Sequence, residues 1–382
     1  MKFEKLKNIV EVKKGKKPSF VVTPDENSVR VLQIDDLRND TNPKYTNDKT
    51  GVLAKEDDVL IAWDGANAGT IGFGKSGYIG STIALLRKKQ PELYSTTFIG
   101  IFLQSQYQYL RSKTTGATIP HISRKALDDL EVPVISVNDQ LHIANLLSKA
   151  ENLVAQRKES IRLLDEFLKS TFLEMFGDPV RNEKGWATKP LGELCNIRRG
   201  ASPRPINNFI GDEVPWIKIG DGTKGNDLYI ESTQVSITKE GATKSVLLDE
   251  GSLVFANCGV SLGFARILKI KGCIHDGWLS FENIRSELNK IYLLKLLNNS
   301  TDYLRRIAPD GTQPNLNTGI MKNFKIILPP INLQTQFAQI VEKTEALKTQ
   351  YQQSLQELEN LYGSLSQRAF RGELSVKQEA VQ

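Results

Sequence analysis

Two stretches of the chain carry apolar residues at helical spacing over a length much greater than one compact domain needs. Between Leu146 and Met175, and again between Ile340 and Leu365, such side chains recur every three, four or seven residues. This spacing is typical of long helices that pair through a heptad-like seam. The predicted seams are Leu146, Ala150, Leu153, Arg157, Ile161, Leu164, Leu168 and Met175, and Ile340, Thr344, Leu347, Tyr351, Leu355, Leu358, Tyr362 and Leu365.

Residues near the ends of both patterns predict where the helices begin and end. Asn138 and Asn332 each follow a proline-containing extended stretch, which favours them as N-caps. The first helix should end at Phe176, before Gly177, and the second near Gly372. Each helix would cover about 36 residues, or roughly 54 Å. We therefore expect the two seams to pair with each other in antiparallel orientation.

The segments that precede the two helices are copies of one another. Each opens with apolar residues at period three, a basic pair, a glycine and then a short alternating strand. The shift is 185 positions at first and 194 later, so loops of different length separate corresponding strands. Aligned segments are 6–15 with 191–200, 32–36 with 217–221, 58–60 with 252–254, 120–123 with 314–317, and 138–153 with 332–347. We predict a mixed α+β fold with two pseudo-symmetric domains, separated by two long antiparallel coiled-coil helices.

This order of domains, with a first long helix that ends in Phe176-Gly177-Asp178-Pro179, resembles the specificity subunit of type I restriction-modification enzymes over essentially the whole chain. Residues 311–317, a following strand and Gln334 are similar to the end of a target recognition domain in that family. Residues 116–123 form a degraded copy of this motif, with Thr118 at the place of the glutamine.

The resemblance implies a division of the chain and a set of partners. Residues 1–136 and 179–331 would be target recognition domains, 137–178 and 332–374 spacer helices, and 375–382 a C-terminal tail. Each domain would read one half of an interrupted site in double-stranded DNA, without catalysis and without a cofactor in this chain. Two modification (methyltransferase) subunits would bring S-adenosylmethionine and methylate adenine, and restriction subunits would join through the complex and use ATP and Mg.

Composition permits this function without requiring it. The net charge of +6 and the pI near 9.0 suit a polyanion ligand. No apolar run is long enough to cross a bilayer, and the N-terminus lacks the apolar centre of a secretory signal, so we expect a cytoplasmic protein without membrane contact. Three scattered cysteines and three histidines predict neither disulfides nor a metal site.

Candidate DNA contacts fall into three groups. Basic residues near the start of each copy would meet phosphates or form solvated strand ends: Lys13, Lys14, Lys16 and Lys17, and Arg198, Arg199 and Arg204. Loops that differ between the copies would read base edges, because each domain must read a different sequence: Trp63, Asp64 and Asn67, and Asn257, Arg266, His275 and Asp276. Trp63 could equally be a core residue. A polar cluster would either stabilise a turn or contact phosphates: Thr312, Gln313 and Asn315.

Parts of the sequence also suggest three other classes of protein. Residues 69–76 match the phosphate-loop pattern GxxxxGK[ST], but residues 77–86 read as a turn and a strand, where such a loop needs a helix. The Pro329–Pro330 pair lacks the aromatic residue of an adenine methylase motif and is predicted to end a strand. A coiled-coil adaptor would explain the helices and leave the duplicated domains unexplained.

Overall fold

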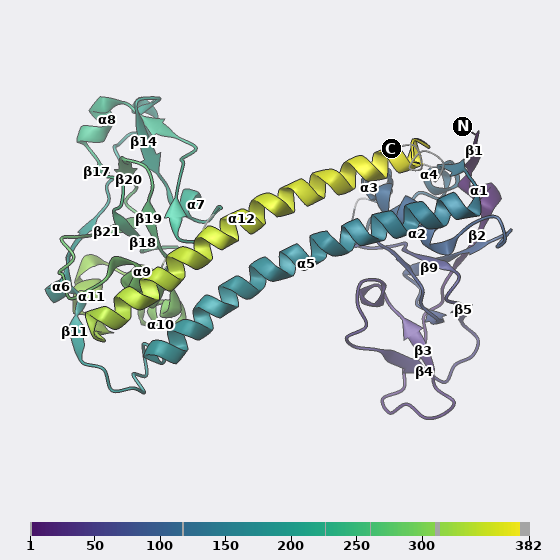
Figure 1. Cartoon of the computed structure of the whole chain (residues 1–382), viewed down its shortest axis with the longest axis horizontal. Helices are drawn as coiled ribbons and strands as arrows, with labels where there is room; N and C mark the ends of the chain where they lie inside the picture. The colour runs from purple at the N-terminus through teal and green to yellow at the C-terminus, as the bar shows by residue number, and fades with distance from the viewer. Residues whose placement is uncertain (1, 117, 226, 260, 310–313, 375–382) are drawn as a thin grey trace. The chain divides into compact units, whose positions relative to one another are not determined.

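The computed structural model describes residues 2–116, 118–225, 227–259, 261–309 and 314–374, and they form two compact units (Figure 1). The first unit takes in residues up to 158 and from 354 onward, and the second takes in residues 159–353. The helix α5 (Val137–Phe176) begins in the first unit and ends in the second, whereas α12 (Ile331–Phe370) does the reverse. The two ends of each long helix therefore belong to different units. The sequence-based division instead placed its boundaries at the helix ends.

The first unit contains two main sheets with strand orders β2-β9-β6-β7 and β4-β3-β8-β5, and β1 pairs with β10. Its strands are β1 (Lys2–Lys5), β2 (Val10–Lys14), β3 (Val29–Leu32), β4 (Lys44–Thr46), β5 (Val52–Ala54), β6 (Val59–Ala62), β7 (Ile71–Phe73), β8 (Gly77–Ile79), β9 (Ile83–Lys88) and β10 (Glu131–Val134). Its shorter helices are α1 (Leu6–Ile9), η1 (Asp35–Leu37), α2 (Thr96–Ser105), α3 (Tyr107–Ser112) and α4 (Arg124–Asp128).

The second unit has sheets of order β12-β21-β18-β19-β15 and β13-β16-β14-β20-β17, with β11 paired to β22. Its strands are β11 (Thr188–Pro190), β12 (Asn196–Arg199), β13 (Ile210–Gly211), β14 (Val214–Ile217), β15 (Tyr229–Ile230), β16 (Ser236–Ile237), β17 (Val246–Leu248), β18 (Leu253–Ala256), β19 (Ala265–Leu268), β20 (Gly272–Ile274), β21 (Trp278–Glu282) and β22 (Lys325–Ile327). Its shorter helices are α6 (Leu191–Leu194), η2 (Ile206–Asn208), α7 (Ile219–Gly222), α8 (Lys239–Thr243), α9 (Lys290–Asn299), α10 (Thr301–Ile307) and α11 (Thr318–Asn323).

The two units repeat one topology, as the sequence predicted. The order β2-β9-β6-β7 corresponds to β12-β21-β18-β19, and β3-β8-β5 corresponds to β14-β20-β17. Even the parallel pairing recurs, since Val31 lies opposite Tyr78 and Trp216 lies opposite Cys273. The prediction of a duplicated α+β framework is thus confirmed.

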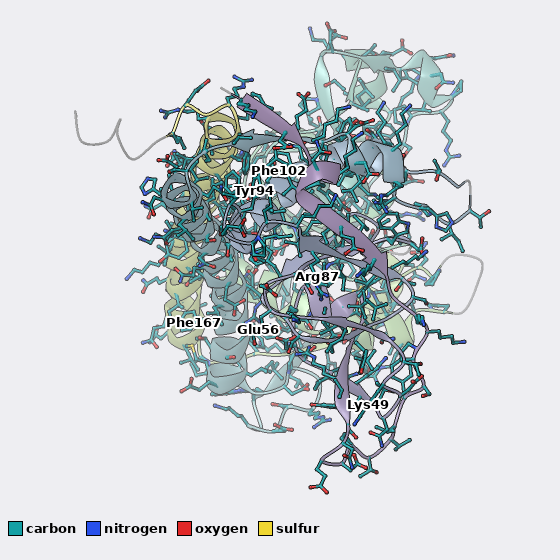
Figure 2. The ribbon with its side chains drawn as sticks, turned by 90° about the vertical axis from the view of Figure 1, so that its right-hand side faces the viewer. Lys49, Glu56, Arg87, Tyr94, Phe102 and Phe167 are labelled. Atoms are coloured by element: carbon teal, nitrogen blue, oxygen red, sulfur yellow. The ribbon has the colours of Figure 1, made fainter. Side chains whose placement is uncertain are left out.

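The core of each unit lies between its sheets, its short helices and the long helices. The strands β6 and β18 are buried along their whole length, because other elements cover both faces of these sheets. In the first unit, Phe102 of α2 (labelled in Figure 2) packs edge-on against Phe370 of α12, with ring centroids 5.3 Å apart. The buried carboxylate of Asp58 accepts two hydrogen bonds from Arg87, at 2.6 and 2.9 Å.

Aromatic side chains fasten both long helices to the second unit. Phe172 and Phe176 of α5 meet Phe337 of α12 and Tyr292 of α9, with ring centroids 4.8 to 6.0 Å apart. All four are fully buried. In each unit, therefore, the start of one long helix packs beside the end of the other, as the predicted antiparallel pair requires.

The predicted seam and helix starts need correction at four positions. Leu153 is 50% exposed and Leu347 is 36% exposed, so neither lies in a buried seam. The predicted N-cap Asn138 lies inside the first turn of α5, and the hydroxyl of Ser136 accepts from the Asp139 amide at 3.1 Å instead. Asn332 lies inside α12 in the same way, because that helix begins at Ile331.

The phosphate-loop and methylase alternatives find no support in this fold. Residues 71–73 and 77–79 are the strands β7 and β8, so a strand follows Ser76. The Lys75 ammonium pairs with Asp40 at 2.9 Å. Pro329 and Pro330 join β22 to α12. Among the described residues, no helix combines the length and apolarity that crossing a membrane demands.

One buried glutamine fixes the start of each long helix. The Gln140 side chain accepts from the Ser95 amide at 2.8 Å and donates to the carbonyls of Leu93 and Ile135 at 2.8 and 3.1 Å. Gln334 repeats these bonds 194 positions later, with the Asn289 amide at 2.9 Å and the carbonyls of Glu287 and Pro329 at 3.0 and 2.7 Å. Ser95 and Asn289 are the N-caps of α2 and α9. Each glutamine therefore ties a long helix to a core helix.

We expect Gln334→Glu to destabilise the second unit by about 2 to 3 kcal/mol, because the substitution removes both donors and leaves two buried carbonyls facing an oxygen. Differential scanning calorimetry of the full chain measures this loss. Gln336→Glu adds the same charge at an exposed position of α12 and should change stability by less than about 0.5 kcal/mol. Equal stability of the two variants would contradict the role of the Gln334 hydrogen bonds.

Candidate nucleic-acid interface

Three side chains from distant segments meet at one edge of the first unit. Lys14 ends β2, Asp64 follows β6, and His121 lies in an extended segment that forms a β-bridge with Asp64. Lys14 Nζ lies 2.7 Å from one Asp64 oxygen, and His121 Nδ1 lies 2.5 Å from the other. Burial opposes the ionisation of Asp64, but the hydrogen bonds from Lys14 and His121 outweigh it, so its pKa lies below the usual value. The edge therefore holds a carboxylate between two nitrogen groups.

The second unit brings the same three positions together with different residues. Arg199 ends β12 as Lys14 ends β2, and Cys258 and Asn315 form the β-bridge that corresponds to Asp64 and His121. The surrounding backbone is alike, since Ile122 N donates to Trp63 O at 2.9 Å and Leu316 N to Asn257 O at 2.8 Å. We call these two sets of residues, Lys14/Asp64/His121 and Arg199/Cys258/Asn315, the equivalent triads.

Glycines hold the loops of both triads in a conformation that other residues rarely adopt. Gly69 has a φ of 95° and Gly263 has a φ of 105°. In both units this glycine donates its amide to the last residue of the preceding strand, Ala62 O at 2.8 Å and Ala256 O at 2.9 Å. The loop is therefore a fixed platform, and its side chains are free to differ between units.

A second polar cluster lies beside the triad of the second unit. Arg199 Nε donates to the Asp276 carbonyl at 2.8 Å, Ser202 donates to the Asp276 carboxylate at 2.8 Å, and Arg204 reaches the same carboxylate at 3.5 Å. Burial raises the pKa of Asp276, but the Ser202 hydrogen bond and the nearby His275 and arginines bring it below the usual value. These bonds hold Arg199 at this edge and bring the exposed Arg204 close to it.

His275 is neutral in this cluster. Its Nδ1 accepts from the Gly277 amide at 2.9 Å, and its Nε2 lies 3.1 Å from an Asp276 oxygen. Burial is the main cause that holds its pKa below the usual value. Because Nδ1 accepts a hydrogen bond, the proton of the neutral ring sits on Nε2, which lies close to Asp276.

The remaining basic candidates lie at the surface of the same two edges. Lys13 pairs with Glu11 at 3.2 Å, and Lys16 reaches the carbonyl of Thr50 at 3.4 Å. Lys17 and Arg198 are exposed, and Arg204 is 81% exposed in its side chain. Asn67 accepts from Arg38 at 2.7 Å.

Two sequence-based candidates are unsuitable as base-edge contacts. Arg266 lies in β19 rather than in a loop, is 8% exposed, and donates to Asp227 at 3.0 Å and to the Ala265 carbonyl at 2.9 Å. Asn257 is fully buried and donates to the Asn315 side chain at 3.0 Å. Both are therefore corrected to structural residues, and Trp63, which is half-buried against the core, fits its alternative as a core residue. Thr312 and Gln313 lie outside the described residues.

Sequence reasoning missed His121, Cys258 and Arg38 as surface candidates. The repeat carried the signal for two of them, because His121 aligns with Asn315, and Cys258 aligns with Asp64. No sequence motif marks Arg38, and it reaches Asn67 only in the folded chain.

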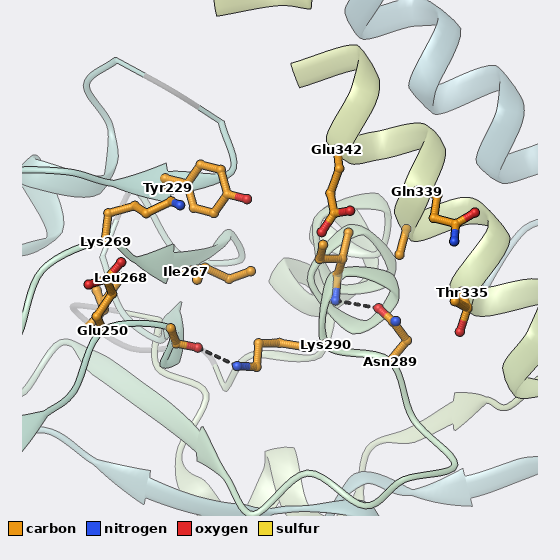
Figure 3. A pocket seen from close by; sticks show the side chains of 13 residues that line it. Tyr229, Glu250, Ile267, Leu268, Lys269, Asn289, Lys290, Thr335, Gln339 and Glu342 are labelled. Carbon is orange, nitrogen blue, oxygen red and sulfur yellow. Dashed lines mark hydrogen bonds between the residues drawn. The ribbon is translucent and has the colours of Figure 1, made fainter. Parts of the chain in front are cut away.

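A pocket of about 510 Å3 lies at the start of α12 (Figure 3). Its Lys290 amine is held by the Gly251 carbonyl at 2.6 Å, and the Lys269 ammonium lies 4.4 Å from the centre of the Tyr229 ring. Burial, then Glu342, raises the pKa of Tyr229, so its phenol stays protonated at neutral pH. Within the described ranges, no group of three or more His, Cys, Asp or Glu residues could hold a metal ion. The edges that carry the equivalent triads remain the better candidate site.

Comparisons with known proteins indicate the family of the chain. The family model described as "Type I restriction modification DNA specificity domain" matches residues 1–163 and 183–360. The type I restriction enzyme MjaVIII specificity subunit of Methanocaldococcus jannaschii is 25% identical, over 95% of this chain and 90% of that protein. The EcoKI specificity subunit of Escherichia coli is 22% identical, over 84% of this chain and 75% of that protein.

Solved structures share the fold. The S subunit of a type I restriction-modification system from M. genitalium superposes with a TM-score of 0.62 at 17% identity, and covers 97% of this chain and 96% of its own. A second structure, from work on complex assembly and conformational transition of the type I R-M system, has a TM-score of 0.58 at 18% identity and covers 98% of both chains. Because the family model matches the greater part of its length, this chain belongs to the type I restriction-modification specificity subunits, which recognise a DNA sequence and are not catalytic.

Proposed function

We propose that each unit reads one half of an interrupted site in double-stranded DNA through its equivalent triad and the basic residues beside it. The observation that carries this proposal is the pairing of one backbone framework with different side chains at the same three positions. A domain that only holds the complex together has no reason to vary there while it keeps its glycines and its hydrogen bonds. Two domains that read different sequences need this variation.

The residue types suit the two roles that DNA recognition demands. Lysines and arginines that contact phosphates set the register, and carboxylate and amide groups read cytosine and adenine edges. Asp64 offers a carboxylate in the first unit, and Asn315 offers an amide in the second. Phosphate contacts would come from Lys13, Lys14, Lys16 and Lys17 in the first unit and from Arg198, Arg199 and Arg204 in the second.

The partners follow from this role. We propose that two modification (methyltransferase) subunits bind the chain and methylate adenine with their own S-adenosylmethionine, and that restriction subunits with ATP and Mg act through the same complex in the cytoplasm. Support comes from membership in the specificity family and from the DNA edges described above. This chain would then choose the sequence, and its partners would supply the chemistry.

Phosphate contact by Arg198 predicts a loss of affinity that does not depend on sequence. Arg198→Ala should weaken binding to specific and random duplexes alike and reduce the slope of log K against log salt by about 1. Fluorescence anisotropy titrations at several salt concentrations measure both effects. Arg181→Ala, at an exposed arginine of the same unit outside the cluster, should leave the slope unchanged. A loss confined to the specific duplex would assign Arg198 to base reading instead.

Separate reading by the two units predicts that triad variants change one half-site each. His121→Ala should relax the sequence at one end of the methylated site and Asn315→Ala at the other, by about 1 to 3 kcal/mol of discrimination per position. Methylation mapping in a host that carries the chain with its methyltransferase identifies the altered bases. If either variant altered both half-sites equally, the assignment of one triad to each half would be wrong.

A further inference from the structure

A pocket of about 590 Å3 opens in the second unit next to the Asp276 cluster. Apolar and ring side chains make up most of its lining: Pro203, Pro205, Ile206, Trp216 and His275. These residues come from the segment after β12, from β14 and from the turn before β21. The pocket therefore lies within the candidate interface and plays no part in the triad.

The polar groups around this pocket are already used or covered. Both ring nitrogens of His275 have partners, the Gly277 amide and the Asp276 carboxylate. The Ser202 hydroxyl donates to Asp276 at 2.8 Å. The Trp216 indole nitrogen is buried and has no hydrogen-bond partner in the part of the chain that the structure describes. The rings thus present mainly carbon to a ligand, so the pocket selects an apolar group.

Positive charge surrounds the mouth of the pocket. Arg204 belongs to its lining and is 81% exposed, and Arg199 is held next to it by the Asp276 carbonyl. The Lys218 ammonium lies 5.8 Å from the centre of the Trp216 ring. An apolar pocket with a cationic rim is complementary to a DNA groove, where phosphates flank the base edges.

We propose that this pocket receives the 5-methyl group of a thymine in the half-site that the second unit reads. The inference rests on the proposed function. Among the groups that base pairs display in the major groove, the thymine methyl is the apolar one, and the other groups are hydrogen-bond donors and acceptors. A base turned out of the duplex would need polar partners for its pairing edge, whereas the Ser202 and His275 side chains are engaged with Asp276 and Gly277 and the Trp216 indole nitrogen is buried.

Among the described residues, the first unit lacks the two rings of this lining. Strand register places Val31 and Gly80 of the first unit at the positions of Trp216 and His275. Both rings are therefore particular to the second unit. The thymine methyl matters in one half-site, and the other half-site serves as an internal control.

The test replaces thymine by uracil, which removes the methyl group and keeps base pairing. The full complex of this chain with its methyltransferase subunits is assayed on duplexes of its mapped site, with uracil at one thymine at a time. In the half-site that the Asn315 variant identifies, one substitution should weaken binding about fourfold, the value of one buried methyl-sized group. Uracil at that thymine should make no difference to a complex that carries Ile206→Ser or Trp216→Ala.

Ile210→Ser is the matched control, because Ile210 is an exposed isoleucine of the same unit outside the pocket. This variant should keep the fourfold preference for thymine. Three results would overturn the proposal if specific binding persists. The half-site of the second unit would contain no thymine, or uracil would be tolerated at every position, or both pocket variants would keep the preference for thymine. A complex that binds no divided site at all would overturn the proposed function, and this inference with it.

Discussion

The hydrogen bonds of one buried glutamine are the contact on which the arrangement of each unit depends. The Gln140 and Gln334 side chains each accept from the N-cap amide of a core helix and donate to two carbonyls, so the first turn of a long helix cannot rotate or slide against its domain. A buried amide that loses one partner costs about 1 to 3 kcal/mol, which makes the geometry specific as well as stable. The aromatic contacts of Phe172, Phe176 and Phe337 then fix the neighbouring helix end.

The second unit adds a charged network where α5, α12 and the sheet meet. Lys348 lies 2.6 Å from Asp165 and 3.4 Å from Asp227, and Asp227 also accepts from Arg266. Burial lowers the pKa of Lys348, but the Asp165 hydrogen bond and the nearby Glu345 and Asp227 raise it above the usual value, so the ammonium stays charged. Lys348 and Arg266 are buried, whereas the carboxylates of Asp165 and Asp227 are about half exposed. Loss of a carboxylate would leave a buried cation without its partner, which is costly, so the network favours one helix register over others. This network gives Arg266 a structural reason to be present.

The sequence predicted the architecture because duplication and periodicity are properties of the whole chain. The repeat located corresponding strands, and the glycines after the long helices marked the ends at Phe176 and Phe370. Individual side chains were harder, since a heptad pattern does not say which neighbour covers each position: Leu153 and Leu347 fit the pattern and are exposed. Arg266 looked like a loop residue because the alignment there followed glycines, and its burial depends on Asp227, which no local pattern connects to it.

The repeat also indicates which residues take part in recognition, even without a bound ligand. Residues that both copies share, such as the buried glutamines and the glycines with positive φ, maintain the fold. A shared residue is therefore poor evidence for recognition. Residues that differ at equivalent, structurally fixed positions that solvent reaches are better evidence, and the equivalent triads meet these conditions, because every member is exposed or partly exposed. Asp64 and Cys258 occupy the same place in the same bridge, but a carboxylate and a thiol present different groups to a ligand. A framework that holds its backbone constant while the chemistry at its edge changes can specify two sequences with one fold.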